Sequence, residues 1–97
     1  MKALRIEGTI IRLDEIKNDL RALQHAVDGY IETVRLQGGG VMIVNEEGLL
    51  REMPYNALAS LVAGTGIHGT ALIVGENGEE FADVPEDYLT LLNCGEV

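Results

Sequence analysis

The chain has 97 residues, 46% of them hydrophobic, and a formal net charge of −9 from sixteen acidic and seven basic side chains. The length predicts a single domain, 1–97, and the charge argues against binding of nucleic-acid backbone over a broad surface. The same charge permits a basic protein partner or mimicry of DNA. It also leaves room for a small anionic ligand at a local cluster of cations or backbone N–H groups.

The sequence shows no sign of a membrane or secretory segment. No apolar run reaches the length of a membrane span, and the first residues lack the pattern of a signal peptide. The single cysteine, Cys94, cannot form a disulfide within the chain. We therefore expect a cytoplasmic protein that does not associate with membranes.

The N-terminal third predicts a strand followed by a helix. Residues 2–13 read as one strand, with a bulge or bend at Gly8 where the parity of the apolar residues shifts. Asp14 offers an N-cap for a helix over 15–28, and Gly29 suits its C-terminal end. The helix is predicted from one apolar stripe, formed by Ile16, Leu20, Leu23 and Val27.

The second predicted strand, 30–36, combines a strand-like composition with a charge on each face. Glu32 shares its parity with Val34, and Arg35 shares its parity with Ile31, so either choice of buried face takes a charged residue with it. Such a conflict between pattern and charge marks either a functional site or an edge strand with its charges at the rim. The sequence leaves both interpretations open.

The remaining chain predicts two more strands and two short helices. Glycines 38–40 indicate a flexible hairpin connection to a strand over 41–45, whose continuous apolar run suggests burial on both faces. Asn56 can cap a helix over 57–63 that turns Leu58, Leu61 and Val62 to the core. A strand over 70–74, a turn over 76–79 and a short helix over 85–92 complete the order β-α-β-β-α-β plus a C-terminal helix. The predicted class is α+β: a small, mainly antiparallel sheet with helices on one face.

The sequence offers no catalytic, metal or cofactor signature. Its two histidines are far apart with no framing carboxylates, and it contains no nucleophile-elbow motif. Adjacent carboxylates such as Glu46 and Glu47 fall in a turn, where such groups are normally solvated. We therefore expect a protein that is not an enzyme and that uses no cofactor.

A ligand pocket has more support than an active site. Tyrosines can stack on a base, arginines can bind phosphate through two N–H groups, and asparagine amides can read a base edge. The alternative for each tyrosine is core packing, and for each histidine a solvated position. The candidate ligand-binding residues are Tyr30, Glu32, Arg35, Asn45, Arg51, Tyr55, Asn56 and His68.

Several segments resemble a known family. LQHAVDGYIETVRL, VNEEGLL, PYNALAS and GTALIVG, within residues 2–90, are similar to a domain of unknown function, DUF3846, found in phages and mobile elements. The resemblance implies a small counter-defence protein related to anti-CBASS sponges. Such a protein would sequester a cyclic nucleotide immune signal, as a homo-oligomer with a pocket shared between subunits. The alternative is an acidic protein-interaction module or DNA mimic that inhibits a host defence enzyme.

Overall fold

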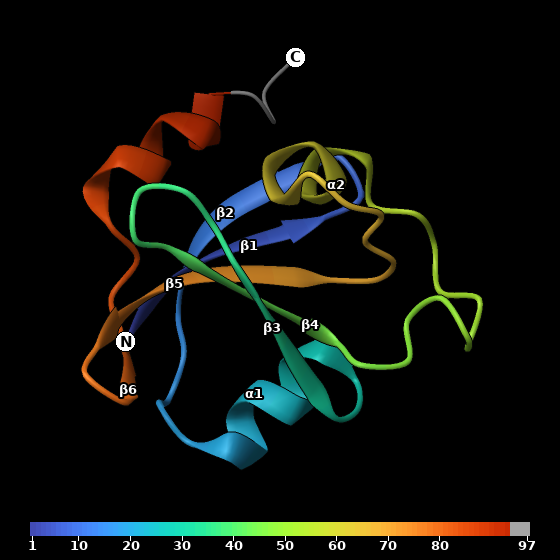
Figure 1. Ribbon diagram of the computed structural model, residues 1–97, viewed down its shortest axis with the longest axis horizontal. Coiled ribbons are helices and arrows are strands. Elements are labelled where there is room, and N and C mark those ends of the chain that lie inside the picture. Colours follow the sequence, from blue (N-terminus) through green and yellow to red (C-terminus); the bar gives the residue numbers. More distant parts are fainter. Residues whose placement is uncertain (94–97) are drawn as a thin grey trace.

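The computed structural model describes residues 1–93, so Cys94 lies outside the described residues. The elements follow the order β-β-α-β-β-α-β-β and end in a 3-10 helix (Figure 1). Their bounds are β1 (Lys2–Glu7), β2 (Ile10–Glu15), α1 (Leu20–Val27), β3 (Ile31–Arg35), β4 (Val41–Asn45), α2 (Ala57–Ala63), β5 (Ala71–Asn77), β6 (Glu80–Ala82) and η1 (Glu86–Asn93). None of the described helices has the length and apolar character needed to cross a membrane.

All six strands form one antiparallel sheet, which confirms the α+β class. The strand order is β2-β1-β5-β4-β3, and β6 pairs with the C-terminal part of β5. The strand that arrives late in the sequence, β5, therefore lies between β1 and β4. The two edges of the sheet are β2 and β3, each joined to its inner neighbour as a hairpin.

The sheet is covered on both faces, which differs from the predicted packing of helices on one face. Alternate residues of a strand point to opposite faces, and all five residues of β4 are buried. Figure 1 draws α1 on one side of the sheet and α2 with η1 on the other. The α1 face buries Ala3, Ile16, Leu23, Val27, Val41, Ile43, Leu72 and Val74. The α2 face buries Leu4, Ile6, Met42, Val44, Ala59, Ile67, Ala71, Ile73 and Val84.

The predicted single strand over 2–13 is a hairpin. Ile6 lies opposite Ile11, so β1 and β2 are two strands that turn back at Gly8 and Thr9. Gly8 has a φ of 62°, a left-handed conformation that glycine adopts without steric cost. The shift in apolar parity at Gly8 therefore marks a reversal of the chain rather than a bend.

The first helix begins five residues later than predicted. Asp19, not Asp14, is its N-cap, and its carboxylate accepts a 2.8 Å hydrogen bond from the backbone N–H of Ala22. Asp14 instead belongs to β2 and accepts a 2.7 Å hydrogen bond from Nε of Arg5. Ile16 is buried although it precedes the helix, and Leu20 is exposed. Of the four residues in the predicted apolar stripe, Leu23 and Val27 form the buried face of α1.

The second helix agrees with its predicted bounds of 57–63. Asn56 is its N-cap, and the Asn56 side chain accepts a hydrogen bond from the N–H of Ala59. Ala59 and Ser60 are its buried residues, and Leu61, predicted to face the core, is exposed. Small residues on this face let α2 lie close to the sheet.

The Asp19 cap predicts a pH dependence of stability. The hydrogen bond from the Ala22 N–H lowers the pKa of Asp19 below its ordinary value of 3.8. A lowered folded-state pKa adds stability above the unfolded pKa, and this stability is lost as pH falls through the folded value. Asp19→Asn keeps an acceptor for the cap but removes the charge. We expect the variant to melt below the native chain at pH 6, and we expect the gap to shrink below the unfolded pKa and to close as pH falls through the folded pKa. If the difference in melting temperature between the two chains stayed constant across this pH range, the role assigned to the Asp19 carboxylate would be contradicted.

Candidate functional site

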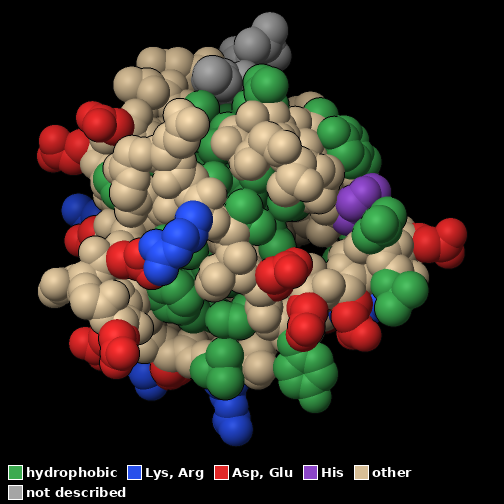
Figure 2. All heavy atoms as spheres, in the orientation of Figure 1, with side chains coloured by type: hydrophobic (Ala, Val, Ile, Leu, Met, Phe, Trp, Pro, Cys, Tyr) green, Lys and Arg blue, Asp and Glu red, His purple; other side chains and the backbone are tan. Residues whose placement is uncertain are grey.

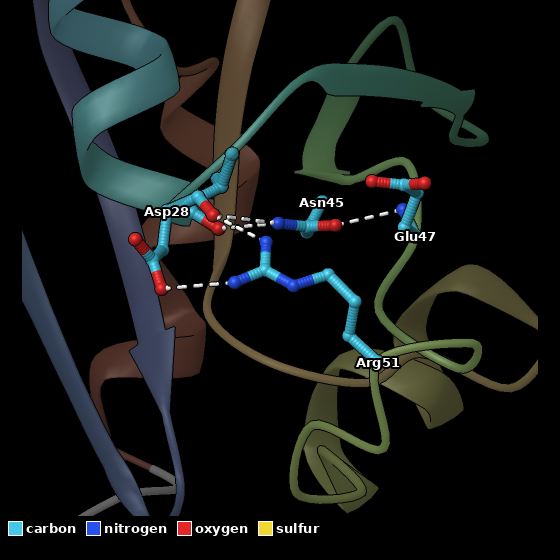
Figure 3. Close-up of polar contacts among 5 residues, drawn as sticks. Asp28, Asn45, Glu47 and Arg51 are labelled. Atoms are coloured by element: carbon cyan, nitrogen blue, oxygen red, sulfur yellow. Dashed lines mark hydrogen bonds and ion pairs between the residues drawn. The ribbon is translucent and has the colours of Figure 1, made fainter.

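Asn45 lies at the end of β4 and joins three backbone groups around the C-terminus of α1. Its side-chain N–H groups donate to the carbonyl oxygens of Val27 and Asp28, each at 3.0 Å, and its carbonyl oxygen accepts from the N–H of Glu47 at 2.7 Å (Figure 3). Asn45 is buried. Its amide is therefore occupied within the fold.

Arg51 belongs to the same network. Its Nη1 donates to the Asp28 carbonyl oxygen at 2.7 Å, and its Nη2 lies 3.5 Å from the Asp28 carboxylate (Figure 3). Asp28 has a φ of 61°, and its carbonyl accepts from both Arg51 and Asn45. Gly29 leaves the space for this contact, because a Cβ there would lie 2.6 Å from Nδ2 of Asn45. The guanidinium of Arg51 thus holds the end of α1 to the chain that follows β4.

Asn56 has the same function on the other face of the sheet. Its Nδ2 donates to the carbonyl oxygens of Ile6 at 3.0 Å and Gly69 at 2.9 Å, while its Oδ1 accepts from Ala59. The residue is buried, and all the hydrogen-bonding groups of its amide are used. As with Asn45, this amide is structural and is not available to a ligand.

Tyr55 and His68 form an aromatic pair at the surface. They meet across an isolated antiparallel bridge, with ring centroids 5.4 Å apart and ring planes at 69°. Nδ1 of His68 lies 3.1 Å from the carbonyl oxygen of Met53. Because a carbonyl can only accept, Nδ1 carries the proton and Nε2 is left as the acceptor of the neutral ring.

Two hollows flank this pair. A hollow of about 310 Å³ is lined by Glu7, Gly8, Pro54, Tyr55, Asn56, Gly69 and Thr70. A smaller one of about 90 Å³ is lined by Glu32, Val44, Asn45, Glu46, Gly48, Leu49, Gly66, Ile67 and His68. Five of the predicted residues line these two hollows: Glu32, Asn45, Tyr55, Asn56 and His68. Sequence reasoning missed Glu7 and Thr70, whose side chains meet at 3.0 Å only because β1 and β5 are neighbours.

Arg35 is apart from these residues, at the opposite end of β3 from Tyr30. It forms a two-point ion pair with Glu76, with Nη–Oε distances of 2.6 and 3.1 Å, and its side chain is 78% exposed. Glu32 and Arg35 are both exposed on an edge strand. The edge-strand interpretation of the β3 charges is therefore correct, and the two predicted phosphate-binding arginines do not converge.

Arg35 also lines a hollow of about 440 Å³ with Leu36, Gln37, Leu61, Val62, Ala63, Gly64 and Tyr88. The hydroxyl of Tyr88 donates to the carbonyl oxygen of Gln37, and the Tyr88 ring packs against the glycine loop 38–40. A Cβ at Gly40 would lie 2.6 Å from this ring. Gly38 and Gly40 therefore lie against Tyr88 of η1, and Gly39 has a φ of 88°, a left-handed conformation that favours glycine.

Residues 46–55, the 46–55 loop, present apolar side chains to solvent. Leu49 is 72% exposed and Leu50 is 80% exposed. Figure 2 shows hydrophobic and acidic side chains side by side in the region where Figure 1 draws this loop. The acidic residues of the loop are Glu46, Glu47 and Glu52, all exposed, and its one cation, Arg51, is already paired with Asp28. Tyr30, also exposed, accepts a hydrogen bond at its carbonyl from the N–H of Glu46.

The loop is held in shape by its own backbone. Hydrogen bonds run from the N–H of Arg51 to Glu47 at 2.8 Å, from Glu52 to Leu49 at 3.0 Å and from Met53 to Gly48 at 2.9 Å. Gly48 is buried directly against the carbonyl of His68, where a Cβ would have no room. The two leucines are therefore displayed by an ordered loop, which lowers the entropy lost when a partner covers them.

Within residues 1–93, no three His, Cys, Asp or Glu side chains are grouped so that they could hold a metal ion. The cations of the described surface are largely occupied: Arg5 and Arg12 approach Asp14, Lys17 approaches Asp19, and Arg35 and Arg51 pair as described above. The arrangement is suited to binding through acidic, apolar and aromatic groups more than through phosphate recognition.

Comparisons with known proteins identify the family and the fold. The family model described as "Domain of unknown function (DUF3846)" matches residues 1–93. A solved structure titled "Crystal structure of small RNA methyltransferase HEN1" aligns with a TM-score of 0.69 and 18% identity, over 98% of this chain and 16% of that one. This chain thus spans about a sixth of that protein, and the likeness shows the fold alone. A search of curated proteins found no significant match.

Replacing Asn45 tests its structural role. Asn45→Ala leaves the carbonyls of Val27 and Asp28 and the N–H of Glu47 without their partner, so we expect a loss of about 2 kcal/mol or more in the free energy of unfolding. Urea titration followed by circular dichroism measures this loss. Asn77→Ala is the matched control, because Asn77 is exposed and should change stability by less than about 0.5 kcal/mol. Equal losses in both variants would contradict the assigned role.

Proposed function

The chain belongs to the family described as a domain of unknown function, DUF3846, and from its geometry we propose that the protein acts by binding rather than by catalysis. Its ligand is a basic surface of another protein. The 46–55 loop is the centre of the contact, and the surrounding carboxylates set the choice of partner. The observation that carries this proposal is the ordered display of two adjacent, highly exposed leucines beside three exposed glutamates.

The chemistry of this surface supports a protein ligand over a phosphate ligand. Contiguous exposed apolar side chains rimmed by charge are typical of protein–protein contacts. The net charge of −9 attracts a basic partner and accelerates its association. Meanwhile Arg35 and Arg51 are neutralised by Glu76 and Asp28, so a phosphate would have to displace a carboxylate from each.

The biological setting of the proposal comes from the resemblance to phage proteins. The partner would be a host defence enzyme in the cytoplasm, inhibited when this acidic surface covers a basic site such as a nucleic-acid groove. A protein that mimics DNA charge in this way should bind more weakly as ionic strength rises, because salt screens exposed charges.

A paired substitution tests the loop. Leu49→Ser/Leu50→Ser removes both apolar side chains but no charge, and Leu61→Ser removes an equally exposed leucine, 79% exposed, from α2. We expect a host protein to be retained by immobilised native chain and by Leu61→Ser, and to be lost with the double variant and at 0.5 M salt. Quantitative mass spectrometry of the eluates gives the readout. Eluates that are identical for the three baits would overturn the proposal.

A second candidate function is sequestration of a nucleotide signal. It is favoured by one observation: Tyr55, 60% exposed, forms a wall of the hollow of about 310 Å³ and offers a ring face on which a base can stack. Glu7 and Thr70 line the same hollow and can accept hydrogen bonds from a base. A signal bound there would be read through its base, with little contribution from arginine.

Thermal-shift assays with cyclic di- and trinucleotides test this candidate. A compound present at 100 times its dissociation constant adds about 2.7 kcal/mol to stability, which is a clear shift in a domain of this size. We expect Tyr55→Ala to abolish the shift. Tyr30→Ala should retain it, because Tyr30 is exposed but does not line that hollow. If no compound in the panel shifts the melting temperature, or if the shift survives Tyr55→Ala, sequestration of a nucleotide at this hollow is excluded.

A further inference from the structure

The open edge of β2 is the strongest unassigned surface of the molecule. Within the described residues, β2 pairs with β1 alone and forms one end of the sheet. An open edge exposes unpaired N–H and C=O groups, and proteins usually blunt such edges. The β2 edge carries three charged residues, Arg12, Asp14 and Glu15, together with exposed apolar ones: Ile10 is 59% exposed and Leu13 is 42% exposed.

The hydrogen bonds to β1 determine which residues of β2 face outward. The N–H of Ile16 donates to the carbonyl of Met1 at 2.8 Å, and the N–H of Met1 donates to the carbonyl of Ile16 at 2.7 Å. Even-numbered residues of β2 therefore bond to β1, since bonding alternates along an antiparallel pair. The free backbone groups are those of Ile11, Leu13 and Glu15.

We propose that β2 pairs antiparallel with β2 of a second copy of this chain, centred on Leu13, so that two sheets join into one continuous sheet. In this register Leu13 lies opposite Leu13 of the second copy, and their backbone groups form a hydrogen-bonded pair. Within one chain Asp14 already pairs with Arg5 at 2.7 Å and with Arg12 at 3.1 Å. In this register Arg12 also lies opposite Asp14 of the second copy, and by symmetry this contact occurs twice. Opposite charges placed directly across a sheet stabilise it.

Charge selects this register over its neighbours. Only the odd-numbered residues have free backbone groups, so an odd-numbered residue must lie opposite an odd-numbered residue of the second copy. The twofold axis then passes through a residue and not between two. An axis at residue 12, 13 or 14 leaves most of the strand paired. An axis at Arg12 sets two guanidinium groups against each other, and an axis at Asp14 sets two carboxylates against each other, both of which destabilise. The axis at Leu13 avoids these repulsions and replaces them with two opposite-charge pairs.

The other edge, β3, lacks this complementarity. The N–H of Leu36 donates to the Gly40 carbonyl at 2.9 Å, which makes the odd-numbered residues of β3 the outward-facing ones. Glu32 and Arg35 differ in parity, so no antiparallel self-pairing can place one opposite the other. The β2 edge is therefore the one that fits a second copy.

Cysteine cross-linking tests the register itself. Across a hydrogen-bonded antiparallel pair, Cα atoms are about 5.5 Å apart, within the range of about 4.4–6.8 Å that a disulfide spans. Leu13→Cys, made in the chain that carries Cys94→Ser, should therefore oxidise to a covalent dimer. Ile10→Cys is the control: Ile10 is more exposed, but it would be about 20 Å along the strand from its counterpart, six residues at about 3.4 Å each. Equal cross-linking of the two variants would indicate random collision and overturn the proposal.

The oligomeric state provides the second measurement. Sedimentation equilibrium of the native chain should show a dimer in reversible equilibrium with monomer. Leu13→Lys puts two ammonium groups on the twofold axis and should raise the dissociation constant by about tenfold or more, because like charges directly opposite each other destabilise a strand pair. Arg12→Glu should weaken the dimer as well. A monomeric native chain, or a dimer unaffected by Leu13→Lys, would overturn the proposal. Loss of binding by the 46–55 loop variant would leave it untouched, because the two surfaces share no residue.

Discussion

Two buried side-chain amides hold the irregular parts of this protein to its sheet. Asn45 is the last residue of β4 and Asn56 precedes α2, and each satisfies three backbone groups. A buried peptide group without a partner is costly, so the turns around α1 and α2 depend on these amides. Hydrophobic packing fixes the sheet and the helices, while the two asparagines fix how the connections cross it. The 46–55 loop follows Asn45 directly, and the Asn45 side chain accepts from the N–H of Glu47 at its start.

The regular elements could largely be predicted from local pattern. The apolar run over 41–45 indicated a doubly buried strand, and Asn56 indicated the start of α2; both are confirmed. The prediction of one strand in the N-terminal region was wrong because Gly8 was interpreted as a bend. Its positive φ belongs to a hairpin turn. That error also displaced the N-cap from Asp19 to Asp14. The prediction that the helices pack on one face of the sheet was wrong for a different reason. The sequence does not reveal which strand lies at the centre of a sheet.

The candidate site shows where residue chemistry alone misleads. Arginine, asparagine and tyrosine were grouped because each can bind part of a nucleotide, but chemistry does not say whether a group is already occupied. Arg35 and Arg51 have carboxylate partners more than twenty residues away in sequence. Such partners are set by tertiary contacts and leave no local signal. Tyr55 and His68, both predicted as ligand-binding residues, contact each other in the structure, and the exposure of Leu49 and Leu50 was not predicted.

The position of β5 imposes an order on the assembly of the chain. The hairpins β1–β2 and β3–β4 are each local in sequence, but the strand that joins them begins only at Ala71. Until β5 has been synthesised, each hairpin keeps an inner edge open and an apolar face uncovered. Non-local strand pairing of this kind slows folding, and partly made sheets with open edges are prone to aggregation. A chain terminated before Ala71 should therefore be a substrate for chaperones or proteases rather than a smaller working domain.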